Sequence, residues 1–287
     1  MTIQLLVFQI LNGIGIGMIY FLLSAGLTLI FGLMRFVNFA HGAFYLIAAY
    51  LAFSVTSLAG TFWLALLAAP LAVGAMALAI EFLLLRHAYR LPHEAQILLT
   101  FATALLIQEI VIIIYGPLGQ NVPVPESLSG VVYLGPYVYP AYRLFLVAIA
   151  ALVAVGLWYV IERTKLGSTL RAGSESSEMV SLLGINTSRV FSATFALGGA
   201  LAGLAGVLAA PIRGVEPFMS AESLGIAFVV VVVGGLGTLS GALVGGLLIG
   251  LTQSIMSTLW PQGAHLMIYT AMAIVILTRP AGLMGRS

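Results

Sequence analysis

Residues Leu5–Leu33 read LLVFQILNGIGIGMIYFLLSAGLTLIFGL and contain no charged side chain. A helix needs about 20 apolar residues to cross the ~30 Å hydrocarbon core of a bilayer, and this run is long enough to do so. Gly13 and Gly17 are four residues apart, so they share one helix face on which another helix could approach closely. Asn12 directly precedes them, and we expect it to serve packing as well, with contact to a substrate as the alternative. The stretch predicts a membrane-spanning helix.

The rest of the chain has the same character. Of its 287 residues, 61% are hydrophobic and 7% are charged, whereas soluble domains carry about 25% charged residues. The apolar runs are continuous and lack the alternation of membrane β-strands. The absence of Cys excludes disulfides and thiolate chemistry, and no pattern indicates a metal or cofactor. We predict a single all-α domain over residues 1–287, a polytopic transmembrane bundle of about eight to ten helices with short or re-entrant segments.

Nine apolar runs are candidate spans. They are Leu5–Leu33, Gly42–Ala59, Phe62–Leu85, Ala95–Tyr115, Leu144–Ile161, Val190–Ala210, Leu224–Gly234, Ala242–Leu259 and Leu266–Thr278. The seventh and the last are short, so either could be a half-helix or a re-entrant segment. We expect nine crossings, with eight or ten as alternatives.

Nine crossings would place the N-terminus outside and the C-terminus in the cytoplasm. Arg143 and Arg213 would then lie outside, and the other basic residues would be cytoplasmic, as the positive-inside rule requires. Those residues are Arg35, Arg86, Arg90, Arg163, Lys165, Arg171, Arg189, Arg279 and Arg286. The longest external loop, Gly116–Ala141, contains five prolines, and we expect an ordered cap there.

One polar segment interrupts the apolar chain. Residues Arg163–Arg189 read RTKLGSTLRAGSESSEMVSLLGINTSR and hold four of the eleven Lys and Arg residues. Ser174 can cap a helix that runs over Glu175–Leu183, and Gly184 can end it in the left-handed conformation. This helix would either pack on its own bundle or dock on a cytoplasmic partner. The candidate docking residues are Arg171, Glu175, Glu178, Met179, Leu182, Leu183 and Gly184.

Polar residues near or within the spans are candidates for a gate or a translocation path. Asn38, His41 and Gly42 lie at an expected cytoplasmic helix boundary, where they could form a gate or simply cap a helix. Gln108 and Glu109 fall within the fourth span and could line a path, bond a neighbouring helix or lie near the outer interface. Glu81 lies one turn from Arg86, and we expect it to reach the membrane interface.

Glycines elsewhere indicate packing and a turn. Gly199 and Gly203 repeat the four-residue spacing of a close helix contact. The segment from Gly234 to Gly246 lacks the Lys-Ser/Thr pair of a P-loop, so we interpret it as a sharp turn between two spans. The glycines assigned to this turn are Gly234, Gly235, Gly237 and Gly241. No ATP site is expected in this chain.

Three stretches resemble bacterial branched-chain amino acid ABC importer permeases. The first is GLTLIFGLMRFVNFAHGAFYLIAAY, which contains Asn38-Phe39-Ala40-His41-Gly42. The second is GSTLRAGSESSEMVSLLGINTSRVFSATFALGGALAGLAGVL, and the third is VVVVVGGLGTLSGALVGG. They are spread over nearly the whole chain in the order and spacing of that family. Where the family commonly has small residues, this chain has Met179 and Val180.

The resemblance implies an inner-membrane permease that is not itself an enzyme. It would pair with a homologous permease, two cytoplasmic ATP-binding cassette ATPases and a periplasmic solute-binding protein, and it would need no cofactor. The expected substrate is a branched-chain amino acid, with urea, an amide or an aromatic acid as alternatives. An ion-coupled transporter is the competing function, but the chain has no Asp to bind a coupling ion. No nucleophile–base signature supports an intramembrane enzyme.

Overall fold

The computed structural model describes residues 3–34, 37–89 and 91–285, and eight helices in this part are long and apolar enough to cross a membrane. The long helices are α1 (Ile3–Met34), α2 (His41–Ala59), α3 (Phe62–Ile80), α5 (His93–Tyr115), α6 (Ala141–Arg163), α9 (Thr187–Arg213), α11 (Leu239–Leu259) and α12 (Ala264–Thr278). A π-helical turn, Glu81–Leu85, joins α3 to α4 (Arg86–Ala88). The shorter helices are α7 (Lys165–Glu175), α8 (Ser177–Leu182) and α10 (Met219–Gly234).

All nine apolar runs form helices, which confirms the predicted helical membrane fold. The seventh run, α10, has 16 residues and is therefore about 24 Å long, short of the ~30 Å hydrocarbon core. The last run is longer than its apolar residues alone indicate. A 3-10 turn at Pro261–Gly263 extends α12 at its start, so that the 18-residue segment Pro261–Thr278 is long enough to span.

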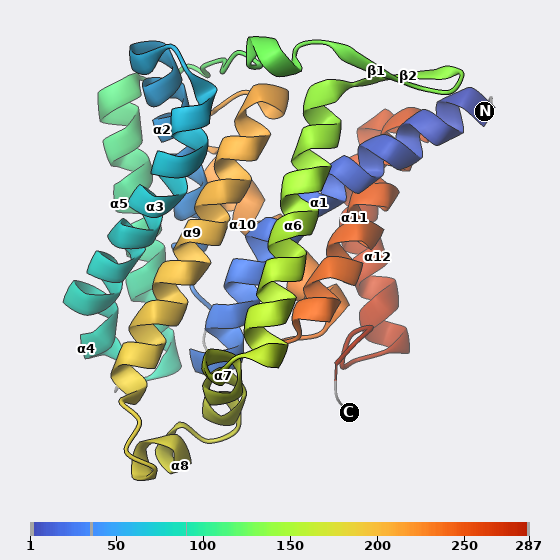
Figure 1. Cartoon of the computed structure of the whole chain (residues 1–287). Helices are drawn as coiled ribbons and strands as arrows, with labels where there is room; N and C mark the ends of the chain where they lie inside the picture. Colours follow the sequence, from blue (N-terminus) through green and yellow to red (C-terminus); the bar gives the residue numbers. More distant parts are fainter. Residues whose placement is uncertain (1–2, 35–36, 90, 286–287) are drawn as a thin grey trace.

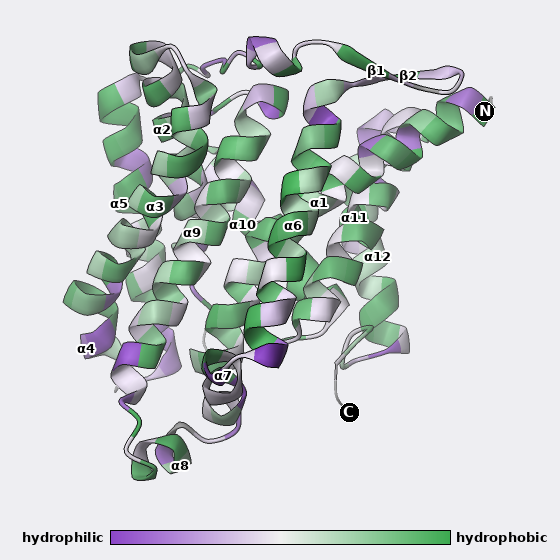
Figure 2. Cartoon of the chain, viewed as in Figure 1, coloured by the Kyte–Doolittle hydropathy of each residue, from purple (hydrophilic) through white to green (hydrophobic). Residues whose placement is uncertain are grey.

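The two ends of the bundle differ in what they carry (Figure 1). The N-terminal end of α1 and the hairpin of β1 (Val131–Leu134) and β2 (Tyr137–Pro140) lie at one end, and α7, α8 and the C-terminus lie at the other. Apolar residues cover the length of the helices, and hydrophilic residues gather at the two ends (Figure 2). This is the arrangement that a multi-pass membrane protein requires.

The basic residues divide between these ends. Arg143 near the start of α6 and Arg213 at the end of α9 lie at the hairpin end. The other basic residues in the described part lie at the α7–α8 end, and they are Arg86, Arg163, Lys165, Arg171, Arg189 and Arg279. Arg35, Arg90 and Arg286 lie outside the described residues.

The long loop between α5 and α6 is ordered, as its prolines predict. It contains a 3-10 turn at Glu126–Leu128 and the antiparallel β1–β2 pair, in which Val131 lies opposite Pro140. Gln120 and Val215 exchange two backbone hydrogen bonds of 2.8 Å, which tie this loop to the segment after α9. The hairpin end of the bundle is therefore capped by regular structure.

Glycines bring the central helices into backbone contact. A Cβ atom on Gly17 of α1 would lie 2.8 Å from the Gly246 carbonyl oxygen of α11. A Cβ on Gly199 of α9 would lie 2.4 Å from the Cβ of Ala77 in α3, and one on Gly203 would lie 3.1 Å from the Cα of Pro70. Real Cβ atoms essentially never show the distances found at Gly17 and Gly199, and the distance at Gly203 is tighter than most, so larger residues at Gly17 and Gly199 would force the helices to shift.

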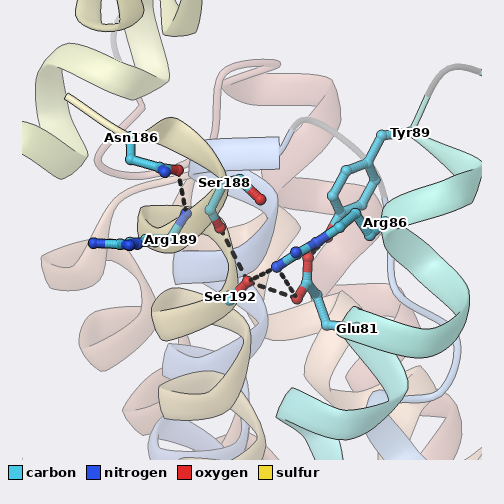
Figure 3. Close-up of polar contacts among 7 residues, drawn as sticks. All are labelled: Glu81, Arg86, Tyr89, Asn186, Ser188, Arg189 and Ser192. Carbon is cyan, nitrogen blue, oxygen red and sulfur yellow. Dashed lines mark hydrogen bonds and ion pairs between the residues drawn. The ribbon is translucent and has the colours of Figure 1, made fainter. Parts of the chain in front are cut away.

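Glu81 does not reach the membrane interface, contrary to its expected position (Figure 3). Its side chain is fully buried at the start of the π-helical turn, where it faces α9. Oε2 accepts a 2.6 Å hydrogen bond from Ser192 Oγ of α9 and lies 3.5 Å from Nη2 of Arg86. Oε1 accepts a 2.9 Å bond from the Tyr89 hydroxyl. Partners on two elements therefore satisfy the buried carboxylate, which removes the need to reach water.

Two further contacts complete this cluster. Arg86 Nη2 also donates to Ser192 Oγ at 2.8 Å, and Ser192 Oγ in turn contacts the Ser188 carbonyl at 3.0 Å. Burial, followed by the charge of Glu81, raises the pKa of the Tyr89 hydroxyl above its usual range, so the hydroxyl stays protonated and donates. The cluster joins the α3–α4 unit to the first turns of α9.

The cluster predicts that Glu81→Leu lowers thermal stability far more than Glu81→Gln. Leucine removes the carboxylate that accepts from Ser192 and Tyr89 and leaves Arg86 without its ion pair, a loss of about 3 kcal/mol because Arg86 is only partly buried. Glutamine keeps the shape and one acceptor oxygen. The measurement is the melting temperature in detergent, with Glu94→Leu at an exposed carboxylate as the control. Equal melting temperatures for both Glu81 variants and the wild type would contradict this role.

Candidate functional site

Two cavities follow the same three helices, α1, α6 and α11. The first, the hairpin-side pocket, has a volume of about 120 Å³ and also touches the end of α9. It is lined by Asn12, Gly15, Ile16, Ile19, Tyr20, Arg143, Leu146, Ile212, Arg213 and Gln253. Aliphatic side chains make one part of this wall, and two arginines with three uncharged polar groups make the other.

The second, the α7-side cavity, has a volume of about 1290 Å³ and opens at the opposite end. Its wall comes from α1 and α6, from α7 with Arg171 and Glu175, and from residues 236–243 at the start of α11. Tyr20 lines the hairpin-side pocket, and the next residue, Phe21, lines the α7-side cavity. The two spaces therefore approach each other from opposite ends of α1.

Hydrogen bonds organise the polar part of the hairpin-side pocket. Asn12 Oδ1 accepts from Nη1 of Arg143 and from the Tyr139 hydroxyl, the latter at 3.3 Å. Burial raises the pKa of Tyr139 even though the Arg143 charge lowers it, so this hydroxyl is a donor. The hydroxyl of Tyr20 donates to Oε1 of Gln253, which joins α1 to α11. Asn12 thus belongs to a polar network across three elements, in addition to the helix packing that was its expected role.

The two arginines of the pocket differ in their partners. Arg213 Nη2 lies 2.6 Å from Oε1 of Glu222 in the first turn of α10. Within the described residues, Arg143 has no carboxylate oxygen within the 4.0 Å of a salt bridge. Sequence reasoning used both residues only for orientation. The one sequence signal that could have suggested a binding site here is that both arginines lie just inside the ends of their spans.

The predicted gate residues lie deep in the bundle. Nε2 of His41 lies 2.8 Å from the Leu23 carbonyl oxygen, and Leu23 precedes the end of α1 at Met34 by eleven residues, about 16 Å along the helix. Asn38 is also buried, and its Oδ1 accepts from the Ala40 amide at 3.0 Å. The expected position at a membrane boundary is therefore wrong, because the chain after α1 returns into the bundle before α2 begins.

Gly42 marks a contact between two helix starts. A Cβ on Gly42 would lie 2.2 Å from the Ser220 carbonyl oxygen in the first turn of α10. Only glycine allows the N-terminal turns of α2 and α10 to meet so closely. Asn38, His41 and Gly42 are not among the residues that line the hairpin-side pocket or the α7-side cavity.

Gln108 and Glu109 also lie away from both cavities. Gln108 is half-buried and Glu109 is exposed on the outward face of α5. In the described part of the chain, no hydrogen bond or ion pair joins either residue to Asn38 or His41. The sequence identified the span correctly, but a carboxylate's direction around a helix depends on which face its neighbours cover.

The polar segment forms two helices where we expected one. α7 occupies Lys165–Glu175, and α8 begins after Ser176, whose side chain accepts from the Met179 amide at 3.2 Å. The predicted cap at Ser174 is wrong, because Glu175 ends α7 and Ser176 takes the capping role. Gly184 has φ +80°, the left-handed conformation expected where the helix stops.

α8 presents its apolar side chains to solution. Met179, Leu182 and Leu183 are 60%, 78% and 74% exposed, whereas Val180 is buried. Glu178 is exposed on the same short helix. Arg171 of α7 instead turns back to α6, where Nη1 donates to the Ile161 carbonyl and lies 3.5 Å from Glu162. Exposed apolar side chains that project outside the bundle in this way form a surface suited to docking.

The glycine-rich segment forms the turn between α10 and α11. Gly235 and Gly237 have φ +111° and +78°, which other residues rarely adopt. A Cβ on Gly234 would lie 2.1 Å from the Gly241 carbonyl oxygen. The turn also contributes to the wall of the α7-side cavity through residues 236–240.

Comparison with known proteins identifies relatives of the whole chain. The family model for the permease component of branched-chain amino acid transport systems matches residues 9–277. The high-affinity branched-chain amino acid transport system permease protein LivH of Salmonella typhimurium is 30% identical, over 97% of this chain and 95% of the relative. BraD of Pseudomonas aeruginosa, with the corresponding description, is 31% identical over the same shares.

A second kind of permease protein is also similar. LivM of Escherichia coli K12 is 29% identical over 93% of this chain and 68% of its own length. No solved structure matches the chain. Because the family match extends over residues 9–277, from α1 into α12, the chain belongs to the family of branched-chain amino acid transport system permease components.

Proposed function

We propose that this chain is the membrane-spanning permease subunit of an ATP-binding cassette importer that moves branched-chain amino acids into a bacterial cytoplasm. The observation that carries the proposal is the family match over residues 9–277. The chain resembles both LivH and LivM, two permease proteins of one kind of transport system, which supports pairing with a homologous permease. Two separate ATPases would supply the energy, and a periplasmic binding protein would deliver the substrate.

The charge distribution supports one orientation in the inner membrane. Arg and Lys residues gather at the α7–α8 end, and Arg143 and Arg213 lie at the hairpin end. Cytoplasmic loops carry the excess of basic residues, so the α7–α8 end would face the cytoplasm. The hairpin would then face the periplasm, where a binding protein docks.

The exposed face of α8 is the proposed contact with the ATPase. Val180 anchors α8 to the rest of the chain, and Met179, Leu182 and Leu183 remain outside it. Covering these three side chains would remove apolar surface from water, the main favourable contribution to most protein contacts. Glu175 and Glu178 would border this contact. The turn at Gly184 would determine how far α8 projects from the bundle.

A movement of α8 would be transmitted to the membrane-spanning helices through two connections, α7 and the start of α9. α7 forms part of the α7-side cavity wall, so its displacement would change the mouth of that cavity. After α8 the chain enters α9, whose start is capped by the Asn186 side chain and fixed to Glu81 through Ser192 (Figure 3). The substrate would pass from the hairpin-side pocket to the α7-side cavity along α1, α6 and α11.

The docking proposal predicts that Leu182→Asp releases the ATPase and abolishes transport. An unpaired carboxylate buried in the contact would cost several kcal/mol, whereas the variant should still insert because α8 lies outside the bundle. Leu118→Asp, at a side chain of similar exposure in the opposite loop, is the control and should retain the ATPase. Co-purification measures the result. Equal recovery of the ATPase with both variants would contradict the docking role of α8.

The orientation can be measured with single cysteines, since the chain has no native Cys. Ser176→Cys between α7 and α8 should react with an impermeant thiol reagent only from the cytoplasmic side. Ser129→Cys in the loop before the hairpin should react only from the periplasmic side. The reversed pattern would overturn the orientation.

The function itself predicts that leucine uptake requires the full complex. Proteoliposomes with this chain, its partner permease and the ATPases should accumulate radiolabelled leucine when ATP and the loaded binding protein are supplied. The permease alone should accumulate none. Uptake of urea, an amide or an aromatic acid in place of leucine would change the substrate, and uptake driven by an ion gradient without ATP would overturn the mechanism.

A further inference from the structure

We propose that the hairpin-side pocket is a substrate-binding site in which Arg143 binds the carboxylate of an aliphatic amino acid and the aliphatic wall receives its side chain. The inference rests on the proposed function, because it assigns the binding groups for that substrate. It adds a site that the family match does not specify.

The charge of the pocket indicates an anionic group. Arg213 is neutralised by Glu222 at 2.6 Å, whereas no carboxylate of the described residues lies within salt-bridge distance of Arg143. A partly buried guanidinium is stabilised by a carboxylate, which it can bind through two parallel hydrogen bonds. The pocket therefore has one cation left for a ligand.

The groups around Arg143 hold its guanidinium in place. Nη1 donates to Asn12 Oδ1, and that oxygen also accepts the Tyr139 hydroxyl. A guanidinium has five N–H donors, so the bond to Asn12 leaves others for a ligand. Because Asn12 and Tyr139 come from α1 and β2, the position of the cation is set before a ligand arrives.

The rest of the pocket suits a short aliphatic chain. Ile16 and Ile19 of α1, Leu146 of α6 and Ile212 of α9 supply the apolar wall. The volume of about 120 Å³ is close to that of an engineered apolar cavity of ~150 Å³ that binds benzene, and the carboxylate end can extend toward Arg143. An aliphatic amino acid combines these two requirements.

A cysteine reporter in the pocket can test the site directly. Gly15 lines the pocket, and a Cβ added there meets only the Tyr139 hydroxyl, at 3.9 Å. Gly15→Cys should therefore place a thiol beside the site without displacing a helix. The assembled complex, with its other subunits free of cysteine and without the binding protein, is placed in phosphatidylcholine nanodiscs. The rate of modification by a small methanethiosulfonate reagent is then measured.

The ligand series separates carboxylate recognition from general apolar binding. Leucine and 4-methylpentanoate, which both carry the carboxylate, should slow modification, and 3-methylbutylamine, which lacks it, should not. At ten times the dissociation constant the rate should fall about tenfold, because the free fraction falls as 1/(1 + [L]/Kd). Arg143→Gln should remove this protection and Arg143→Lys should retain part of it. Ser129→Cys, in the exposed loop, should show no protection.

Several outcomes would overturn the proposal. One is that 3-methylbutylamine protects the Gly15→Cys thiol as well as leucine does. Another is that protection by leucine survives in Arg143→Gln. A third is that phosphatidylglycerol nanodiscs protect the thiol without leucine, which would assign Arg143 to a lipid phosphate. If Arg143→Gln does not assemble, the ligand series on Gly15→Cys decides alone. Leucine uptake without protection of Gly15→Cys would reject this site and leave the importer function intact. Uptake of a different solute only would reject the proposed substrate itself.

Discussion

Backbone contact between glycine-bearing helices is the constraint on which this structure depends. Lipid removes most of the hydrophobic drive for helix association, so membrane helices gain stability by approaching closely. α1 does so on two sides. A Cβ on Gly250 of α11 would lie 2.3 Å from the Gly17 amide, and a Cβ on Gly26 would lie 2.5 Å from the Gly198 carbonyl of α9. Both cavities border α1, so these contacts also set where the hairpin-side pocket ends and the α7-side cavity begins.

Breaks in the helices are confined to places where protein surrounds them. α2 begins inside the bundle, and its first turn touches the first turn of α10 through Gly42. In hydrocarbon an open backbone group costs several kcal/mol, so such breaks need internal partners. Asn38 bonds the Ala40 amide, and His41 bonds the Leu23 carbonyl. The Asn38–Gly42 motif therefore lies in the interior, and Asn38, His41 and Gly42 are not among the residues that line the two cavities.

The elements at the α7–α8 end combine an exposed apolar surface with a cavity wall. α8 exposes apolar side chains, α7 borders the α7-side cavity, and both belong to one short connection between α6 and α9. The Glu81 cluster ties the start of α9 to the α3–α4 unit. A displacement at α8 can therefore reach the cavity mouth directly and the distant α3 helix through a buried, fully paired carboxylate.

Composition and apolar run length determined the class of fold, the nine helices and the ends that carry charge, because spanning the bilayer core imposes a minimum apolar length on each helix. The polar composition of residues 163–189 also located the segment outside the bundle, where Met179, Leu182 and Leu183 are exposed. The site could not be read in the same way. Glu81 was expected at the interface and is buried, Glu109 was expected to be deep and is exposed, and Asn12 joins Arg143 from a distant helix. Hydropathy locates each span in the sequence, and the position of a residue within the span tells how far along the helix it lies. Which way its side chain points, and what it meets, is decided only when glycine contacts fix the rotation of each helix against its neighbours.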